Sequence, residues 1–257
     1  MKYLLFTTIL LFSLVPGVKS QVTEKPDVDP QLVLHDFKSW WNYHYSHVSL
    51  SANFTGFDTN SMPLDKEAFL TQLSSGEYIA LRLSSKDPGM KLQLYKLNAS
   101  VNTDISVTAK RVGLEAYSYY KMEGTPLPGN GFTDIAGKVY DKESLQGKVL
   151  VLKCWFIHCQ SCVEEMPALN QAIKPFKKRE DVVFVSLATD TPEALKTFLK
   201  KIKFDYAVVA EQRGYMTDQL QVSGYPTHFI IDKKGMIAKV TSRYEEMLVA
   251  LEEELKK

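Results

Sequence analysis

The run from Val149 to Trp155 constrains the fold of this chain more than any other segment. Its residues, Val-Leu-Val-Leu-Lys-Cys-Trp, are almost continuously apolar. A strand with one solvent-exposed face alternates apolar and polar residues, so a strand without this alternation is expected to be buried on both faces. A helix is expected soon afterwards, from about Gln160. The segment therefore predicts an α/β architecture with helices packed on a central sheet.

The alternation of strands and helices continues towards the C-terminus. Val182–Ala188 is a second apolar strand, and Thr191-Pro192-Glu193 combines the cap, first-turn proline and acid that begin a helix. Residues 227–240 predict a hairpin at the end of the sheet. Ser242 and Glu245 have the spacing of a capping box, which predicts the start of the last helix.

A glycine- and proline-rich stretch, residues 124–131, separates this part from the residues before it. Residues 21–123 contain helical and extended patterns in a different order, and predict a small α+β region without recognisable chemistry. We therefore expect two structured parts, residues 21–123 and residues 124–257.

Aromatic residues mark one helix of the first part. Phe37, Trp40, Trp41 and His44 have the spacing of one helix face. Such clusters can bind sugars or peptides. Packing of an apolar helix face on a sheet is the commoner use of these residue types, and is what we expect here.

The first twenty residues, 1–20, have the pattern of a cleavable signal peptide. Lys2 precedes an apolar run from Tyr3 to Val15, and Pro16-Gly17 leads to small residues near Ser20. A spanning helix needs roughly 20 apolar residues, so membrane anchoring by an uncleaved segment is the less favoured alternative. The pattern predicts an exported protein, periplasmic in a bacterial cell, where thiols meet oxidants.

The composition excludes several classes of protein. The 31 basic and 30 acidic residues give a net charge of +1, so there is no basis for a nucleic-acid partner. Hydrophobic residues make up 45% and charged residues 24%, which is ordinary for a folded protein. Three cysteines are too few for a scaffold held together by disulfides.

The three cysteines are clustered, at Cys154, Cys159 and Cys162. A structural zinc site usually takes four ligands from two pairs, and this chain has one Cys-x-x-Cys pair. The pair follows the expected strand and begins a helix, where backbone N–H groups and the helix dipole favour a thiolate at Cys159. The setting predicts a redox-active dithiol. Cys154 is expected to be a buried, inert thiol.

Residues 155–167 resemble the Trp-x-x-x-Cys-x-x-Cys-x-x-Glu-x-Pro block of exported thioredoxin-like proteins of the TlpA/ResA type, which carry a redoxin or AhpC/TSA-like domain. Gly137–Tyr140 and Gly147–Leu152 resemble the opening hairpin and first long strand of that family. Gly224–Asp232 resembles its cis-proline loop and the next strand. The resemblance covers about residues 124–257 and implies a thioredoxin fold, with a central mixed sheet flanked by helices.

The resemblance also implies an activity, thiol–disulfide oxidation and reduction. Cys159 would attack a partner disulfide, and Cys162 would release the mixed disulfide, so the pair would alternate between a dithiol and a Cys159–Cys162 disulfide. Glu165 matches the family's active-site acid, which would take the proton of Cys162. The alternative for Glu165 is a solvated helix glutamate, a role that we expect for Glu164.

The same resemblance implies the substrate-binding residues and the partners. Pro226 matches the cis-proline, which would present the backbone of Tyr225 to an incoming chain, and Trp155 is expected beside them. The partners would be disulfide-bearing exported proteins and a membrane electron donor to the dithiol. No cofactor or metal is expected, because the disulfide carries the two electrons.

Several positions depart from the family pattern. Lys153 stands where relatives carry a buried Asp or Asn, and could assist proton transfer or extend its ammonium to the surface. His158 stands where an aromatic residue is common, and could lower the pKa of Cys159 or play no part. Gln160 and Ser161 are neutral, whereas strong oxidants of this fold usually carry a basic residue there. We therefore expect a reductase.

Two other functions remain as alternatives. A copper-binding chaperone of the same fold would use the cysteine pair and a distant histidine such as His228, although such proteins usually space their cysteines by three residues. A thiol peroxidase would have a Thr or Ser three residues before the first cysteine, a position that Phe156 occupies.

Overall fold

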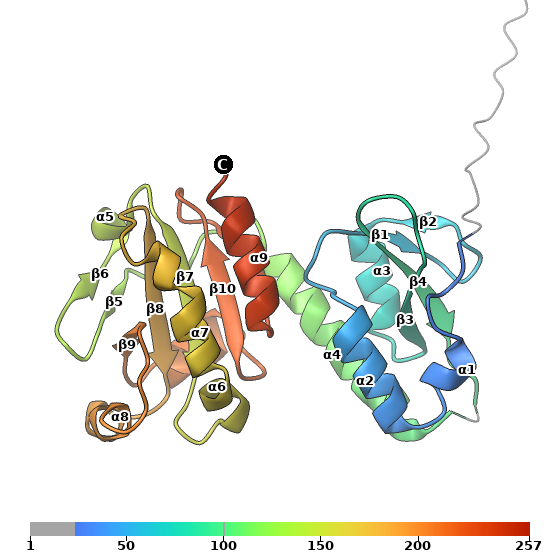
Figure 1. Ribbon diagram of the computed structural model, residues 1–257, viewed down its shortest axis with the longest axis horizontal. Coiled ribbons are helices and arrows are strands. Elements are labelled where there is room, and N and C mark those ends of the chain that lie inside the picture. Colours follow the sequence, from blue (N-terminus) through green and yellow to red (C-terminus); the bar gives the residue numbers. More distant parts are fainter. Residues whose placement is uncertain (1–23, 100) are drawn as a thin grey trace, which may run out of the picture.

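The computed structural model describes residues 24–99 and 101–257 and places them in two lobes that one long helix connects (Figure 1). The predicted signal peptide lies outside the described residues. Among the residues described, no helix is both long enough and apolar enough to cross a bilayer.

The first lobe is a four-stranded sheet packed against helices, which confirms the predicted α+β region. Its strands lie in the order β2-β1-β4-β3, with β1 parallel to β4 and the other pairs antiparallel. The aromatic face of the second helix packs in this core, where Trp40 is buried and stacks near Trp41 and His44. The elements are α1 (Pro30–Val33), α2 (Phe37–His47), β1 (Phe54–Phe57), β2 (Pro63–Leu64), α3 (Lys66–Leu73), β3 (Tyr78–Arg82), β4 (Met90–Lys96) and α4 (Thr103–Met122).

The second lobe has a five-stranded sheet in the order β11-β10-β7-β8-β9, in which β7, β8 and β9 are parallel and β10 and β11 antiparallel. This order, with three parallel strands and an antiparallel hairpin at one edge, is that of the predicted thioredoxin fold. The strands are β5 (Phe132–Thr133), β6 (Val139–Tyr140), β7 (Val149–Trp155), β8 (Val182–Ala188), β9 (Ala207–Val209), β10 (Thr227–Ile231) and β11 (Ile237–Thr241). The helices are α5 (Lys142–Leu145), α6 (Gln160–Glu164), α7 (Met166–Ala172), α8 (Pro192–Leu199) and α9 (Tyr244–Glu254), with a 3₁₀ turn at Lys174–Phe176 and a π-helical turn at Tyr215–Gln219.

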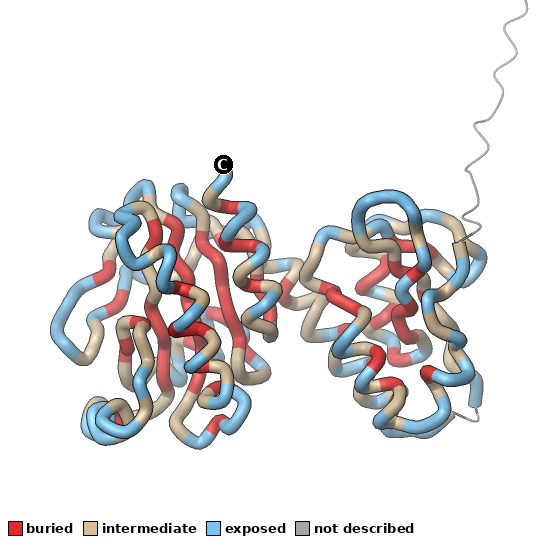
Figure 2. The backbone as a smooth tube through the Cα atoms, viewed as in Figure 1, coloured by how far each residue is buried: buried red, intermediate tan, exposed pale blue. Residues whose placement is uncertain are grey.

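Strand β7 lies at the centre of this sheet, and every one of its residues is buried (Figure 2). Helices α7 and α9 cover one face, where Leu169 and Leu251 pack on Val149 and Val151. The other face is covered in part by α4, because Tyr119 reaches into that core. The absence of alternation in β7 is thus explained by cover on both faces.

The ends of two helices test the capping predictions. Thr191 caps α8 as expected, since its hydroxyl accepts a hydrogen bond from the N–H of Ala194 at 3.3 Å. The capping box predicted for the last helix is wrong. Helix α9 begins at Tyr244 without a side-chain cap, and the hydroxyl of Thr241 accepts from the N–H of Arg243 instead.

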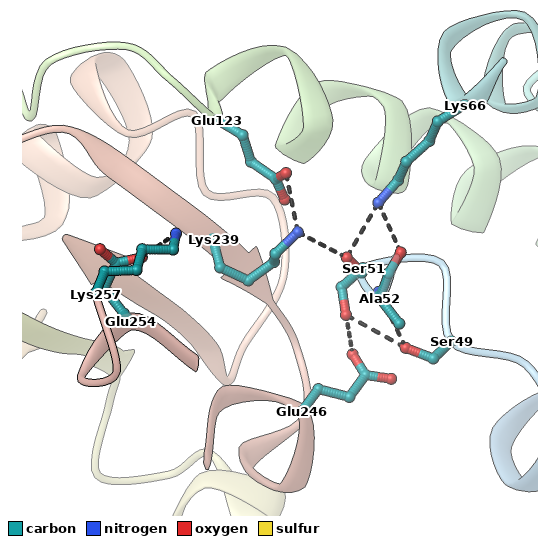
Figure 3. A network of polar contacts seen from close by, with 9 residues as sticks. All are labelled: Ser49, Ser51, Ala52, Lys66, Glu123, Lys239, Glu246, Glu254 and Lys257. Carbon is teal, nitrogen blue, oxygen red and sulfur yellow. Dashed lines mark hydrogen bonds and ion pairs between the residues drawn. The ribbon is translucent and has the colours of Figure 1, made fainter. Parts of the chain in front are cut away.

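The two lobes are joined by polar contacts as well as by α4 (Figure 3). Lys239 on β11 donates to the carbonyl of Ser51 at 2.9 Å and pairs with Glu123 at 3.0 Å. The hydroxyl of Ser51 donates to the carboxylate of Glu246 on α9. These half-buried contacts join specific partners, so they hold the first lobe in one position relative to the second.

Candidate functional site

The site lies where β7 ends and α6 begins. Cys159 occupies the N-cap position of α6 and is disulfide-bonded to Cys162, with their Cα atoms 5.2 Å apart. The sulfur of Cys159 accepts the backbone N–H of Cys162 at 3.3 Å and lies 3.6 Å from the hydroxyl of Ser161. Cys159 is 6% exposed and Cys162 fully buried, so Cys159 is the sulfur that a partner can reach.

Beneath the disulfide lies a buried ion pair. The ammonium of Lys153, from β7, donates to the carbonyl of Cys162 at 3.2 Å and to the carboxylate of Glu165. Glu165 lies at the break between α6 and α7, which begins at Met166 with Pro167 as its second residue, and its side chain is 10% exposed. Lys153 is fully buried. Its ammonium is therefore held against the resolving cysteine, and the expectation that it could extend to the surface is wrong.

A third titratable side chain completes this cluster. His228, on β10, lies opposite Lys153 in the strand register and is fully buried. Its Nε2 is 3.1 Å from Oε1 of Glu165, an ion-pair distance. The angles do not make a hydrogen bond, and neither ring nitrogen has a hydrogen-bond partner among the described residues.

The pKa values of the three groups follow from burial and mutual charge. Burial lowers the pKa of Lys153, and Glu165 partly offsets this. Burial alone would raise the pKa of Glu165, but His228 and Lys153 outweigh it and lower that pKa. Burial also lowers the pKa of His228, which keeps its ring neutral near pH 7. The cluster is therefore an ion pair with a neutral imidazole beside it.

The structure decides several of the sequence interpretations. Glu165 is not a solvated helix residue, because it pairs with two buried groups. Cys154 is a free, buried thiol as expected, and burial raises its pKa. His158 is exposed. The sequence offers His228 only as a metal ligand, and its place opposite Lys153 comes from the pairing of β7 with β10.

The cis-proline loop lies beside the disulfide. The Tyr225–Pro226 bond is cis, as the resemblance implies. The Tyr225 ring meets Phe156, from the loop before Cys159, edge to face at 5.3 Å. The N–H and C=O of Tyr225 form no hydrogen bond with any residue that the structure describes. Such free backbone groups are able to pair with an incoming chain.

The expected place of Trp155 in the substrate-binding surface is corrected. Its side chain is fully buried beneath the site, where it packs against Phe198 and Phe204 at ring distances of 5.6 and 5.8 Å. As the last residue of β7, it is covered on its face by α8 and the following loop. Trp155 therefore supports the disulfide loop from within, and its side chain is not exposed at the surface of the site.

The copper-binding alternative gains no support from this arrangement. Within residues 24–99 and 101–257, no group of three or more His, Cys, Asp or Glu side chains is placed to hold a metal ion. His228, the histidine considered for copper, faces Glu165.

Comparison with known proteins identifies relatives of the second lobe. Residues 123–240 match the AhpC/TSA family. The thiol-disulfide oxidoreductase ResA of Bacillus thuringiensis subsp. konkukian (strain 97-27) is 31% identical over 152 residues, which cover 57% of this chain and 87% of the relative. ResA of Bacillus subtilis (strain 168) is 28% identical over 120 residues, which cover 47% of this chain and 67% of the relative.

Two solved structures are similar to about half of this chain. The thioredoxin domain of a thiol-disulfide oxidoreductase from Bacteroides vulgatus is 21% identical, with a TM-score of 0.46, and the match covers 51% of this chain and 96% of that structure. A thiol-disulfide oxidoreductase from Bacteroides fragilis is 20% identical, with a TM-score of 0.45, and covers 50% and 98%.

A thioredoxin-type sheet with a Cys-x-x-Cys disulfide after its central strand and a cis-proline beside it defines the class, the thiol–disulfide oxidoreductases. The chain is an enzyme of this class. Its sequence similarity is more specific, and the chain belongs to the ResA family of thiol-disulfide oxidoreductases.

Proposed function

We propose that this enzyme reduces disulfides in exported proteins. The observation that carries the direction is the environment of the Cys159 sulfur. Within the described part of the chain, its hydrogen-bond contacts are the Cys162 N–H and the Ser161 hydroxyl, both neutral groups. The buried cation, Lys153, lies on the side of Cys162 and is already paired with Glu165.

Strong oxidants of this fold stabilise the attacking thiolate, which makes their disulfides easy to reduce. Here the helix end remains as the stabilising feature, and such a contribution is about 0.3–1 kcal/mol. For a two-electron couple this corresponds to only about 6–20 mV. The disulfide should therefore be hard to reduce, and the dithiol should be a good electron donor.

The reaction then proceeds in two exchanges. The Cys159 thiolate attacks one sulfur of the substrate disulfide, which forms a Cys159–substrate disulfide and releases the other substrate sulfur as a thiolate. The Cys162 thiolate then attacks the Cys159 sulfur and releases the second substrate thiolate. Two electrons pass from the dithiol to the substrate, and the Cys159–Cys162 disulfide remains.

Glu165 takes the proton that Cys162 must lose before the second exchange. Lys153 holds Glu165 in place and touches Cys162, and neutral His228 can share the proton. Once Glu165 is protonated, the Lys153 ammonium can offset the charge of the buried Cys162 thiolate, which would otherwise be costly in this environment.

The place of action follows from the signal-peptide pattern of residues 1–20, which supports a periplasmic or otherwise exported enzyme. Its partners would be disulfide-bearing exported proteins, and a membrane electron donor would restore the dithiol.

Trapping tests the division of labour. Cys162→Ser should accumulate mixed disulfides with a substrate protein such as insulin, because the resolving sulfur is missing. Cys159→Ser should accumulate few. Non-reducing mass spectrometry after acid quenching measures both, and equal trapping by the two variants would overturn the assignment of attacker and resolver.

A further inference from the structure

The two lobes enclose a cavity of about 600 Å³ directly beside the redox disulfide. One wall comes from the second lobe and includes Ser161, between the two cysteines, and Pro226 of the cis-proline loop. The opposite wall comes from the first lobe, from Trp41 and Tyr45 on α2 and from Glu115 on α4. Tyr45 is 52% exposed, so the cavity is open to solvent.

Hydrogen bonds between the lobes hold both walls in place. The hydroxyl of Tyr119, on α4, is 3.0 Å from the hydroxyl of Thr227, the residue after the cis-proline. Arg243, before α9, donates to the carbonyl of Tyr45 at 2.8 Å. Lys239 and Ser51 add the contacts shown in Figure 3. The first lobe is therefore fixed against the catalytic loops, and the cavity is a built feature of the fold.

The backbone at the edge of the cavity suits an extended chain. The free N–H and C=O of Tyr225 lie two residues before β10 and can pair with a strand-like segment. A disulfide-bearing segment bound here would run between the two lobes and bring its sulfur to Cys159. The first lobe would then contact the substrate residues that flank the cysteine.

The charges of the cavity favour a basic occupant, because its lining carries six glutamates against three cations, Lys66, Arg111 and Arg243. Lys66 donates to the carbonyls of Ser51 and Ala52, each at 3.0 Å (Figure 3). Arg243 pairs with Glu246 at 3.3 Å. Lys66 and Arg243 therefore have few donors left for an acidic ligand, whereas Arg111, on the first-lobe wall, forms no ion pair with any described residue.

One carboxylate on the first-lobe wall has no such partner. Glu115 forms no hydrogen bond or ion pair with any described residue, although Arg111, one turn earlier on α4, acts on it through charge. A Cβ added to Gly224 would lie 3.5 Å from Oε2 of Glu115, so the carboxylate lies against the cis-proline loop. Burial raises the pKa of Glu115. A cation bound in the cavity would lower that pKa again, because it favours the charged carboxylate. Across the cavity, Glu164 accepts a hydrogen bond from Gln160 and pairs with no cation among the described residues.

We propose that this cavity binds an extended segment of the substrate protein, and that Glu115 of the first lobe selects a basic side chain beside the substrate's half-cystine. The inference rests on the proposed reductase activity. It gives the first lobe a role in substrate choice, in addition to the catalytic loops of the second lobe.

Two synthetic peptides test this proposal. Each is closed by one intramolecular disulfide, and they differ only by Lys or Glu beside the first cysteine. The full chain, reduced beforehand, is mixed with each peptide, and the rate of peptide reduction is followed by chromatography after acid quenching. We expect about a tenfold preference for the Lys peptide, which corresponds to about 1.4 kcal/mol, and a smaller preference at high salt.

Glu115→Gln should reduce this preference to about twofold or less, since it removes the charge and keeps the shape. Glu115→Lys should reverse it. Glu180→Gln, at an exposed position outside the cavity, is the matched control and should keep the wild-type ratio. The ratio of the two peptides for one variant does not depend on how much of that variant folds.

The outcomes separate the two proposals. Suppose that wild type reduces both peptides and hydroxyethyl disulfide. The inference is then wrong, and the reductase stands, if wild type shows no preference between the peptides or prefers the Glu peptide. The same holds if Glu115→Gln keeps the wild-type preference for the Lys peptide. If the reduced enzyme reduces none of these disulfides, the proposed function fails and the inference fails with it.

Discussion

Lys153 and His228 lie opposite each other on neighbouring strands, and both approach the same oxygen of Glu165. The pairing register of β7 and β10 places the two side chains, and the break between α6 and α7 places the carboxylate. All three are buried below Cys162. The stability of this cluster and the chemistry of the resolving cysteine are therefore linked, and can be tested together.

Loss of Lys153 should be costly for stability. Lys153→Met leaves the Glu165 carboxylate buried without its cation, and breaking a buried pair in this way typically costs about 3–5 kcal/mol. Lys153→Met combined with Glu165→Gln removes the stranded charge and should recover much of the loss. Urea unfolding of the oxidised protein at pH 7 measures both, and equal destabilisation by the single and double variants would contradict the pairing.

The free energy of unfolding should decrease as the pH is lowered below 7. The folded-state pKa of His228 is lowered, so the unfolded chain binds more protons as pH falls below about 6.5, the usual histidine value. The contribution of neutral His228 is therefore complete above about pH 6.5 and is lost as pH falls towards the folded pKa. His44, whose pKa burial lowers to about 4, acts in the same direction.

His228→Gln should flatten this dependence, since each extra proton bound by the unfolded state gives a slope of about 1.36 kcal/mol per pH unit. Unfolding free energies between pH 5 and 7.5 provide the measurement. His158→Gln is the control, because His158 is exposed, and its slope should match wild type. A wild-type slope in His228→Gln would show that this buried imidazole is not responsible.

Glu165→Gln should slow the second exchange. The amide cannot accept the proton of Cys162, and general-base assistance of this kind is worth about 10²-fold or more. Stopped-flow release of a fluorescent thiol from a preformed mixed disulfide with Cys159 reports the step. Glu180→Gln should react like wild type. An unchanged rate in Glu165→Gln from pH 6 to pH 8 would exclude Glu165 as the proton acceptor.

The contact between Tyr119 and Thr227 should contribute modestly to stability. Tyr119→Phe removes one buried hydrogen bond, and Thr227 keeps its bond to the carbonyl of Gly224, so the expected loss is about 0.5–1.5 kcal/mol. Tyr45→Phe, at an exposed ring, is the comparison. Chemical unfolding followed by circular dichroism provides the measurement, and equal stability of the two variants would show that the Tyr119 hydroxyl adds nothing at the lobe interface.

The sequence contains enough to predict the second lobe and its disulfide. The apolar run of β7 implies burial on both faces, and the cysteine spacing at the following helix places the redox pair. These features are local, because strand character and helix starts depend on neighbouring residues. The place of Pro226 beside the disulfide comes from the family resemblance, because Pro226 and the two cysteines are far apart in the sequence.

Other features depend on contacts between distant residues. Lys153 can be buried because the carboxylate of Glu165 lies beneath α6 and pairs with its ammonium. The sequence pattern of β7 alone does not show this contact. The capping box at Ser242 failed because Thr241 and Ser51 both bond Glu246 and fix the start of α9 differently. The lobe interface depends on Tyr119 and Lys239, which reach across it from separate elements.

The reduction potential of the Cys159–Cys162 pair tests the central claim most directly. The full chain is equilibrated in glutathione or dithiothreitol buffers at pH 7, and the oxidised fraction is measured by thiol alkylation and mass spectrometry. We predict a potential nearer that of thioredoxin, about −270 mV, than that of the strong oxidant DsbA, about −120 mV. A value more oxidising than about −150 mV would contradict the account and reverse the direction of electron flow.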